Sequence, residues 1–210
     1  MRMPGPGRTM VPMSDFDTSG RTARRHPEPS PAPARGMELP EPAARVHRWV
    51  ETPLGRMVVA VGRHDGRAAI TGCWFADQKH FPEDDVLGRA GDHVLLEEAQ
   101  EQLDAWFAGR RRGFDLPLAL DDRPQPLRPR VWCALRDIPF GTTTTYGALA
   151  AQLGSPGMAQ AVGQGVGRNP WSVIVPCHRV VSSTGALTGY AGGIERKQAL
   201  LEMESQRISQ

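Results

Sequence analysis

The segment Ile174–Val181, "IVPCHRVV", places a thiol, an imidazole and a guanidinium in the middle of an apolar run. Its β-branched residues predict a buried strand, and Pro176 is expected to end that strand because proline donates no ladder hydrogen bond. Cys177 is then expected at the end of the strand, on a bend, with His178 turning away. Adjacent strand residues face opposite sides, so a water molecule is expected to bridge the thiol and the imidazole.

This pair has the chemistry of an activated nucleophile. The thiolate is the reactive form of cysteine, and a neighbouring imidazole lowers the thiol pKa or accepts its proton. A carboxylate behind the imidazole would fix its tautomer, and Glu195, Glu202 and Glu204 are candidates. From the residues alone, a core thiol beside a surface imidazole competes with this interpretation. No metal site is predicted, because zinc prefers a tetrahedral set of ligands and only two cluster here.

Composition sets wide bounds on the class of protein. The chain has 210 residues, 40% of them hydrophobic, which is enough for one or two domains with a proper core. The formal net charge of +2 says little about partners. Lysine occurs only at Lys79 and Lys197, so nearly all positive charge is arginine. Arginine suits bidentate phosphate contacts, although codon usage in a GC-rich genome gives the same enrichment.

The cysteines and the hydropathy indicate the compartment. Cys73, Cys133 and Cys177 are far apart and odd in number, which predicts reduced thiols in a cytoplasmic protein rather than a disulfide framework. A membrane-spanning helix would need a run of about eighteen apolar residues, and none is found. The N-terminus lacks the apolar region of a secretory signal. We therefore expect no membrane association.

The first half divides into a tail and a small domain. Residues 1–43 are rich in proline and arginine and are predicted to be a disordered tail. Two alternatives are a basic arm that contacts nucleic acid and a start codon assigned too far upstream. Residues 44–123 are predicted to form an α+β domain with a small, mainly antiparallel sheet. Its strands are expected within 48–62, 68–75 and 110–120, and a helix over 93–107 ends before Gly109.

The second half, residues 124–210, reads as more helical. We expect a helix over 129–138 opened by Pro129, a helix from Tyr146 capped by threonine and ended by Gly154, and a third with Ser155 as N-cap and Pro156 at its first position. Two short helices joined by a tight glycine turn are a helix-turn-helix signal. A strand-like stretch over 171–181, a glycine-rich loop over 185–193 and a final helix over 195–205 follow.

The segment "IVPCHRVV" followed by "GALTGYAGG" closely resembles the O6-alkylguanine-DNA alkyltransferase family, the methylated-DNA–protein-cysteine methyltransferases. "TPLGRMVVAV", "RVWCALRDIPFGTTTTYGALAAQLG", "AVGQGVGRNP" and "GYAGGIERKQALLEME" extend the resemblance over residues 46–204. It implies an N-terminal ribonuclease H-like α/β domain and a C-terminal winged-helix-like domain that carries the helix-turn-helix.

The resemblance also implies a reaction. The protein would flip O6-alkylguanine out of double-stranded DNA and move the alkyl group onto Cys177, with O4-alkylthymine as a second candidate lesion. The thioether product has no good leaving group, so each molecule would act once. No cofactor would be needed, because the DNA itself donates the alkyl group, and the protein is expected to be a monomer. His178 would take the thiol proton through water, Glu204 would orient His178, and Tyr146 would donate its phenolic proton to the guanine ring.

Further residues are implied to bind the base or the DNA. Asn169 would hold the turn that bears the cysteine through backbone hydrogen bonds. The carbonyl groups of Cys177 and Val180 would accept from the guanine amino group, and the loop at Tyr190 and Ala191 would close over the base. The full set of implied DNA and base contacts is Gln160, Arg168, Asn169, Arg179, Val180, Tyr190 and Ala191.

Two positions depart from the family pattern. The family usually has an arginine in a run like A-R-A-V-G, which fills the gap left by the flipped nucleotide, and Gln160 stands there in this chain. Since flipping costs a few kcal/mol of stacking and pairing, weaker binding or slower repair is expected. Leu127 and Arg128 replace a common Phe-Gln pair, which is expected to alter packing at the domain junction. Affinity for DNA is expected to fall with added salt.

Three other functions compete with suicide repair. A non-catalytic damage-recognition relative commonly replaces the cysteine with tryptophan, whereas this chain retains Cys177. A transcription regulator that uses the helix-turn-helix alone would need a dimer interface or a ligand-sensing domain. A cysteine hydrolase would turn over esters or peptides without any need for DNA.

Overall fold

The computed structural model describes residues 45–120, 126–154 and 156–208. The predicted tail over 1–43, the predicted domain boundary near residue 123 and the predicted cap Ser155 lie outside these ranges. Within them, no helix is both long enough and apolar enough to cross a lipid bilayer.

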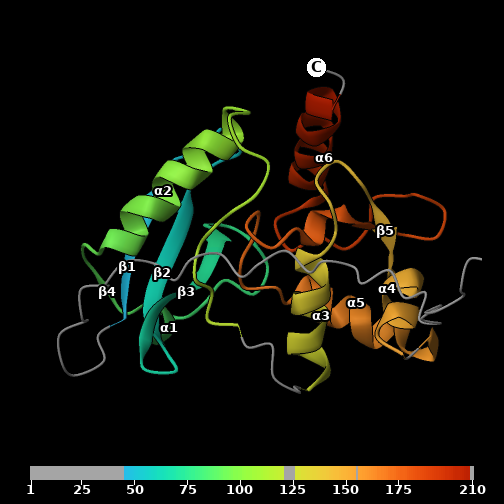
Figure 1. The fold of residues 1–210 in the computed structure, drawn as a ribbon, viewed down its shortest axis with the longest axis horizontal. Coiled ribbons are helices and arrows are strands. Elements are labelled where there is room, and N and C mark those ends of the chain that lie inside the picture. The colour runs from blue at the N-terminus through green and yellow to red at the C-terminus, as the bar shows by residue number, and fades with distance from the viewer. Residues whose placement is uncertain (1–44, 121–125, 155, 209–210) are drawn as a thin grey trace, which may run out of the picture. The chain divides into compact units, whose positions relative to one another are not determined.

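The first half is a four-stranded sheet packed against one long helix (Figure 1). The strand order is β3-β2-β1-β4; the first three are antiparallel and β4 is parallel to β1. Alternate residues of the central strand face opposite ways: Val59 joins the main core with α2, whereas Val58 packs with Trp74 on the other face. The elements are β1 (Val46–Val50), β2 (Met57–His64), β3 (Arg67–Phe75), α1 (Asp84–Leu87), β4 (Arg89–Ala90) and α2 (Val94–Phe107).

The periodic segments of this half are as predicted, and one short strand is not. The strands over 46–50, 57–64 and 67–75 and the helix over 94–107 confirm the sequence pattern. The predicted strand over 110–120 is wrong, because only Leu118 forms an isolated bridge, to Ile70. Pro117 lies at that bridge and has no N–H to donate, so the ladder does not extend.

The second half is mainly helical. Helix α3 begins at Leu127 after Pro126, two residues before the predicted start at Pro129. Helix α4 begins at Tyr146 as predicted, and the Thr145 hydroxyl accepts a hydrogen bond from the backbone N–H of Ala148 at 3.1 Å. The elements are α3 (Leu127–Arg136), β5 (Thr144–Thr145), α4 (Tyr146–Gln152), a 3₁₀ turn (Pro156–Met158), α5 (Ala159–Gly167), a 3₁₀ turn (Cys177–Arg179), β6 (Val180–Val181) and α6 (Ile194–Ile208).

The stretch over 171–181 is buried but is mostly not a strand. Val180 and Val181 pair in parallel with β5, and Trp171 forms an isolated parallel bridge to Cys73. Val173 has a left-handed backbone with φ of +70°. Cys177 opens a one-turn 3₁₀ helix, so the prediction that it ends a strand is wrong. A short apolar run does not distinguish a buried strand from a buried coil. Here the chain curls because its backbone groups bond locally, as in the N–H of Val175 with the carbonyl of Trp171 at 2.9 Å.

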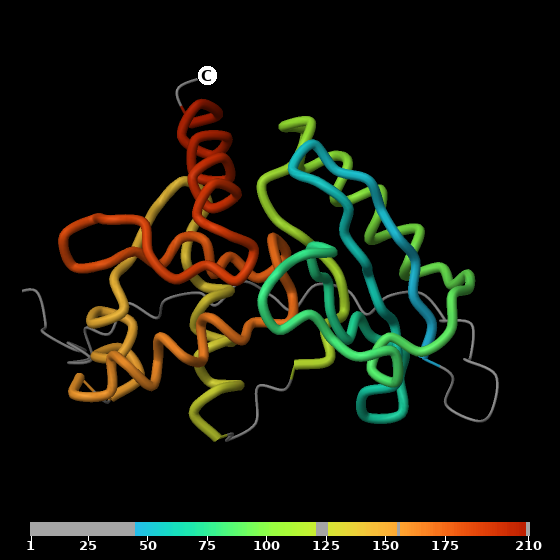
Figure 2. Tube along the Cα trace, turned by 180° about the vertical axis from the view of Figure 1, so that it is seen from behind, coloured from blue at the N-terminus to red at the C-terminus, as the bar shows by residue number. Residues whose placement is uncertain are grey.

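The curled stretch lies against the edge of β3 and joins the two halves. The N–H of Cys73 donates to Pro170 and the N–H of Ser172 donates to Cys73, at 2.7 and 2.8 Å. The indole N–H of Trp171 donates to the carbonyl of Ile70 at 2.8 Å. Figure 2 shows this orange segment next to the green-blue strands. Side chains from both halves form one hydrophobic cluster, which fixes the segment that carries the cysteine.

Candidate active site

Cys177 is a buried thiol on the one-turn 3₁₀ helix. Only 5% of the residue is exposed, and its Sγ atom lies 3.1 Å from Nδ2 of Asn169. Burial raises the pKa of the thiol to about 11, although the Asn169 hydrogen bond and the positive charge of Lys197 oppose that rise. The thiol is therefore protonated at neutral pH, and its reaction as a nucleophile requires a base to take its proton.

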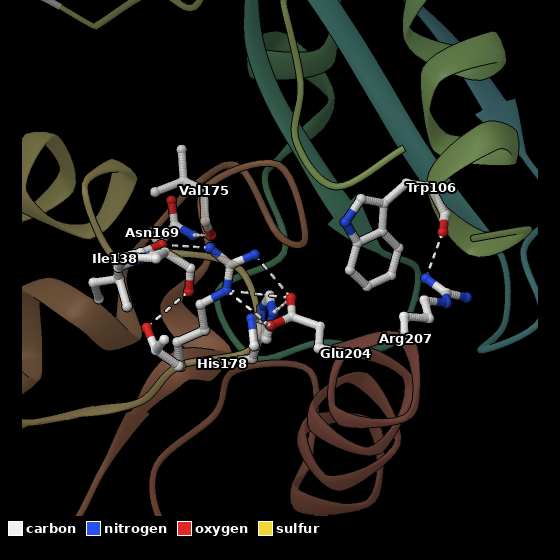
Figure 3. A network of polar contacts seen from close by, with 11 residues as sticks. Trp106, Ile138, Asn169, Val175, His178, Glu204 and Arg207 are labelled. Carbon is white, nitrogen blue, oxygen red and sulfur yellow. Dashed lines mark hydrogen bonds and ion pairs between the residues drawn. The ribbon is translucent and has the colours of Figure 1, made fainter. Parts of the chain in front are cut away.

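Asn169 fixes the backbone around this cysteine (Figure 3). Its Nδ2 group donates to the carbonyl groups of Val175 and Trp171 at 2.9 and 3.2 Å, and its Oδ1 atom accepts from the N–H of Trp171 at 3.1 Å. The hydrogen bonds to backbone that were predicted for this residue are present. A single buried amide thus sets the position of the thiol relative to the end of α5.

His178 and Glu204 form a fully buried pair. Nε2 of His178 lies 3.0 Å from Oε1 of Glu204 and neither residue has exposed surface, whereas the other candidates, Glu195 and Glu202, are exposed. Because the carboxylate accepts from Nε2, that nitrogen carries the hydrogen. Nδ1 is buried and has no hydrogen-bond partner among the described residues. The free nitrogen is thus a proton acceptor on the residue next to Cys177.

The electrostatics favour a neutral imidazole and an ionised carboxylate. Burial lowers the pKa of His178 and outweighs the opposing effect of Glu204, so the ring is neutral at pH 7. Burial alone would raise the pKa of Glu204, but hydrogen bonds from His178 and Arg179 lower it to about 2. The backbone N–H of Gly141 also donates to Glu204 at 2.8 Å. The carboxylate is charged, held from three sides, and able to stabilise an imidazolium.

Arg179 does not point toward solvent, in contrast to the prediction that it contacts DNA. It is 7% exposed, and its Nε and Nη2 groups donate to Glu204 at distances of 2.8 to 3.2 Å. Its Nη1 group donates to the carbonyl of Ile138. The guanidinium donors are directed into the protein because they compensate a buried carboxylate. This structure therefore places Arg179 as a support of Glu204.

Tyr146 and Lys197 meet at the loop that precedes α6. The phenolic O–H of Tyr146 donates to the carbonyl of Thr188 at 3.0 Å, and burial raises the pKa of the phenol. The Nζ atom of Lys197 donates to the same carbonyl at 2.7 Å and to the carbonyl of Val180 at 2.5 Å. Lys197 was not predicted as a site residue. One signal was available: Lys197, Leu200 and Glu204 are spaced to share the buried face of α6.

The remaining predicted residues lie around this centre. Tyr190 is buried and its hydroxyl has no hydrogen-bond partner among the described residues. Gln160 is exposed on α5, and Arg168 is exposed at the end of that helix. A side chain at Gly163 would contact the ring of Tyr146 at 3.5 Å, and Gln160 lies three residues earlier. Residues three apart share a helix face, so Gln160 belongs to the side of α5 that faces Tyr146.

These features define a class of protein: a helix-turn-helix half that carries a buried cysteine next to a buried histidine–carboxylate pair. Residues 126–206 match the family description "6-O-methylguanine DNA methyltransferase, DNA binding domain". The methylated-DNA–protein-cysteine methyltransferase of Mycolicibacterium paratuberculosis is 42% identical over 158 residues, which cover 75% of this chain and 91% of the relative. The constitutive enzyme of Bacillus subtilis is 38% identical over 162 residues, 76% of this chain and 93% of the relative.

Solved structures of methyltransferases of this kind are also similar to this chain. The crystal structure of Mycobacterium tuberculosis OGT in complex with DNA has a TM-score of 0.67 and 41% identity, and the match covers 77% of this chain and 94% of that one. The crystal structure of the M. tuberculosis O6-methylguanine methyltransferase matches with a TM-score of 0.66. The chain belongs to the methylated-DNA–protein-cysteine methyltransferase family.

Proposed function

We propose that this chain carries out its family's reaction with Cys177 as the acceptor. The protein is a methylated-DNA–protein-cysteine methyltransferase, which repairs O6-methylguanine in DNA. The observation that carries the assignment of Cys177 is its setting: a buried thiol on the residue before a neutral histidine, whose Nε2 is bound by a buried carboxylate and whose Nδ1 is free. Cys73 and Cys133 have no comparable pair beside them in the sequence.

The proposed reaction is a displacement at saturated carbon. Sγ of Cys177 attacks the methyl carbon, the carbon–sulfur bond forms, and the bond from that carbon to O6 of guanine breaks with its electron pair on guanine. The thiol proton goes to Nδ1 of His178 through water, and Glu204 stabilises the imidazolium. The departing guanine is protonated by the phenol of Tyr146, which is reprotonated from the imidazolium by way of solvent. The products are neutral guanine and S-methylcysteine at position 177.

The raised pKa of Cys177 limits reaction of the thiol before the lesion is bound. A buried thiol with a pKa of about 11 is protonated in the free protein, so it does not react with every electrophile in solution. Deprotonation is then coupled to His178 at the moment when the lesion is in place. The product is a thioether, which water does not cleave, so the protein is consumed by one reaction.

DNA binding is proposed to use the exposed side of α5. Gln160 would fill the gap left by the flipped base, and Arg168 would contact a phosphate at the end of that helix. The carbonyl groups of Cys177 and Val180 would accept from the guanine amino group, and Tyr190 with Ala191 would close over the base. One protein molecule would act on each lesion in double-stranded DNA.

A titration tests this function. A fixed amount of wild-type protein is mixed with increasing amounts of a duplex that carries one O6-methylguanine, and the remaining lesion is measured by chromatography of the digested DNA. Repair is expected to stop at one lesion per protein; Cys177→Ser is expected to bind the duplex without repair, and Cys133→Ser to repair as the wild type does. Continued turnover, or a repair-competent Cys177→Ser variant, would exclude the proposed chemistry.

A further inference from the structure

One arginine on α6 connects the first half of the protein to the loop that bears Tyr190. Nη1 of Arg196 donates to the carbonyl of Gly192 at 2.9 Å, and its Nε donates to the carbonyl of Leu54 at 2.8 Å. The same guanidinium forms an ion pair with Asp77 at 2.7 Å. Its partners thus lie on three segments: the turn between β1 and β2, the loop after β3, and the loop before α6.

Phe75 and Gly55 pack closely around the guanidinium group of Arg196. The guanidinium carbon lies 4.5 Å from the centre of the Phe75 ring, a cation–π distance. Gly55 has φ of +110°, and a side chain there would come within 3.1 Å of Nη2 of Arg196. A glycine at this turn therefore serves both the backbone conformation and the close approach of the guanidinium.

The loop needs such support because of its own composition. Gly189 and Gly193 have φ of +61° and +93°, so this backbone has many alternative conformations to lose when it becomes ordered. A side chain at Gly192 would clash with the rings of Tyr190 and Phe75, at 2.7 and 3.1 Å. The loop is thus packed directly against β3. The N–H of Lys79 adds a hydrogen bond to the carbonyl of Ala191 at 2.9 Å.

We propose that Arg196 is a positioning residue for alkyl transfer, through which the N-terminal sheet holds the loop 189–193 in the geometry that closes over the base. The proposal rests on the proposed function of this loop. Arg196 itself touches no reacting atom. It sets the place of Gly192, two residues from Tyr190, and a small displacement of a group that orients the substrate slows a reaction much more than it weakens binding.

Arg207, on the same helix, provides a control for the loss of an arginine that connects α6 to the first half. Nη1 and Nη2 of Arg207 donate to the carbonyl groups of Trp106 and Phe107, both at 2.7 Å, so this arginine also connects α6 to the first half (Figure 3). Arg207 lies near the opposite end of α6 from the loop 189–193. Arg207→Ala removes contacts of the same kind without touching that loop, which separates positioning from general stability.

The experiment compares Arg196→Ala, Arg196→Lys and Arg207→Ala with wild type, at a temperature where thermal unfolding shows that all four are folded. The transfer rate constant is measured at saturating O6-methylguanine duplex, and affinity is measured separately on the same duplex. Arg196→Ala is expected to transfer about tenfold more slowly or worse, with affinity unchanged within about twofold. Arg196→Lys should recover part of the rate, and Arg207→Ala should transfer at the wild-type rate.

Hydrogen exchange gives a readout that needs no chemistry on DNA. Exchange of the Lys79 and Gly193 amides, which bond to Ala191 and Tyr190, is expected to accelerate in Arg196→Ala and not in Arg207→Ala. A wild-type rate and unchanged exchange in Arg196→Ala would overturn the proposal, and so would equal losses in the two alanine variants. If wild type transferred no methyl group, the proposed function would fail, while the exchange result would still decide whether Arg196 holds the loop.

Discussion

Removal of the charge on Glu204 tests the buried network that supports the site. Glu204→Gln has nearly the same shape and leaves an oxygen that can accept from Nε2 of His178. It removes the negative charge that faces Arg179, whose Nε and Nη2 groups lie 2.8 to 3.2 Å from the carboxylate. The variant thus leaves a buried guanidinium without its counter-charge.

The expected loss of stability follows from the pKa of Glu204. That pKa is lowered from the ordinary 4.5 to about 2, which at about 1.4 kcal/mol per pH unit corresponds to roughly 3 kcal/mol. Because the folded pKa is lowered, this stability is present above the unfolded pKa of 4.5 and is lost as the pH falls toward about 2. Leaving one partner of a buried ion pair alone typically costs about 3–5 kcal/mol, which agrees.

Two assays on one preparation measure the effect. Urea unfolding at pH 7 is expected to show a free energy of unfolding lower by about 3 kcal/mol in Glu204→Gln. Transfer at saturating duplex is expected to be slower by about 100-fold, because the imidazolium loses its stabilising charge. Glu202→Gln on the same helix is the control, since Glu202 is exposed and, among the described contacts, its side chain bonds only to Gln198. A Glu204→Gln variant within about 1 kcal/mol of wild type in stability, with a normal transfer rate, would contradict the role given to this carboxylate.

Three further predictions concern DNA contacts and the thiol. Gln160→Arg is expected to raise the repair rate on duplex DNA, and an unchanged rate in a single-turnover assay would count against its proposed role in base flipping. Residues 138–167 contain no charged side chain, and Arg168 follows them directly, so few phosphate contacts are expected from this face. A plot of log affinity against log salt concentration is then expected to have a shallow slope of about −1 to −3. A slope as steep as about −6 would indicate that DNA binds to a different face. With the pKa of Cys177 raised to about 11, its modification by iodoacetamide is expected to rise about tenfold per pH unit between pH 7 and 10, and a plateau near pH 8 would contradict the burial argument.

The periodic parts of the fold could be predicted from the sequence. Helix α2 shows a clear apolar spacing, and Thr145 before Tyr146 gives a cap that the structure confirms. These signals are local, because they depend on residues within one or two turns of each other. The resemblance to a family supplied what local patterns did not, namely that Glu204 rather than Glu195 accepts from His178.

The parts that could not be predicted depend on contacts between distant residues. The apolar run around Cys177 looks like a strand, but its backbone groups bond locally, as in the N–H of Val175 with the carbonyl of Trp171, where the run packs against the distant Cys73. Arg179 looks like a DNA contact until the carboxylate of Glu204, 25 residues away in sequence, is placed beside it. In the sequence, Arg196 likewise looks like any other charged residue of a helix, because its partner Leu54 is 142 residues away.

The site of methylation shows directly whether Cys177 is the nucleophile. The protein is incubated with a duplex that carries one O6-methylguanine, and its intact mass is measured before peptide mapping. A gain of one methyl group is expected, on Cys177 alone, with Cys73 and Cys133 as unmodified internal controls. Methylation at another residue would contradict the assignment of the nucleophile, and unmodified protein bound to intact lesion would indicate a recognition protein without transfer chemistry.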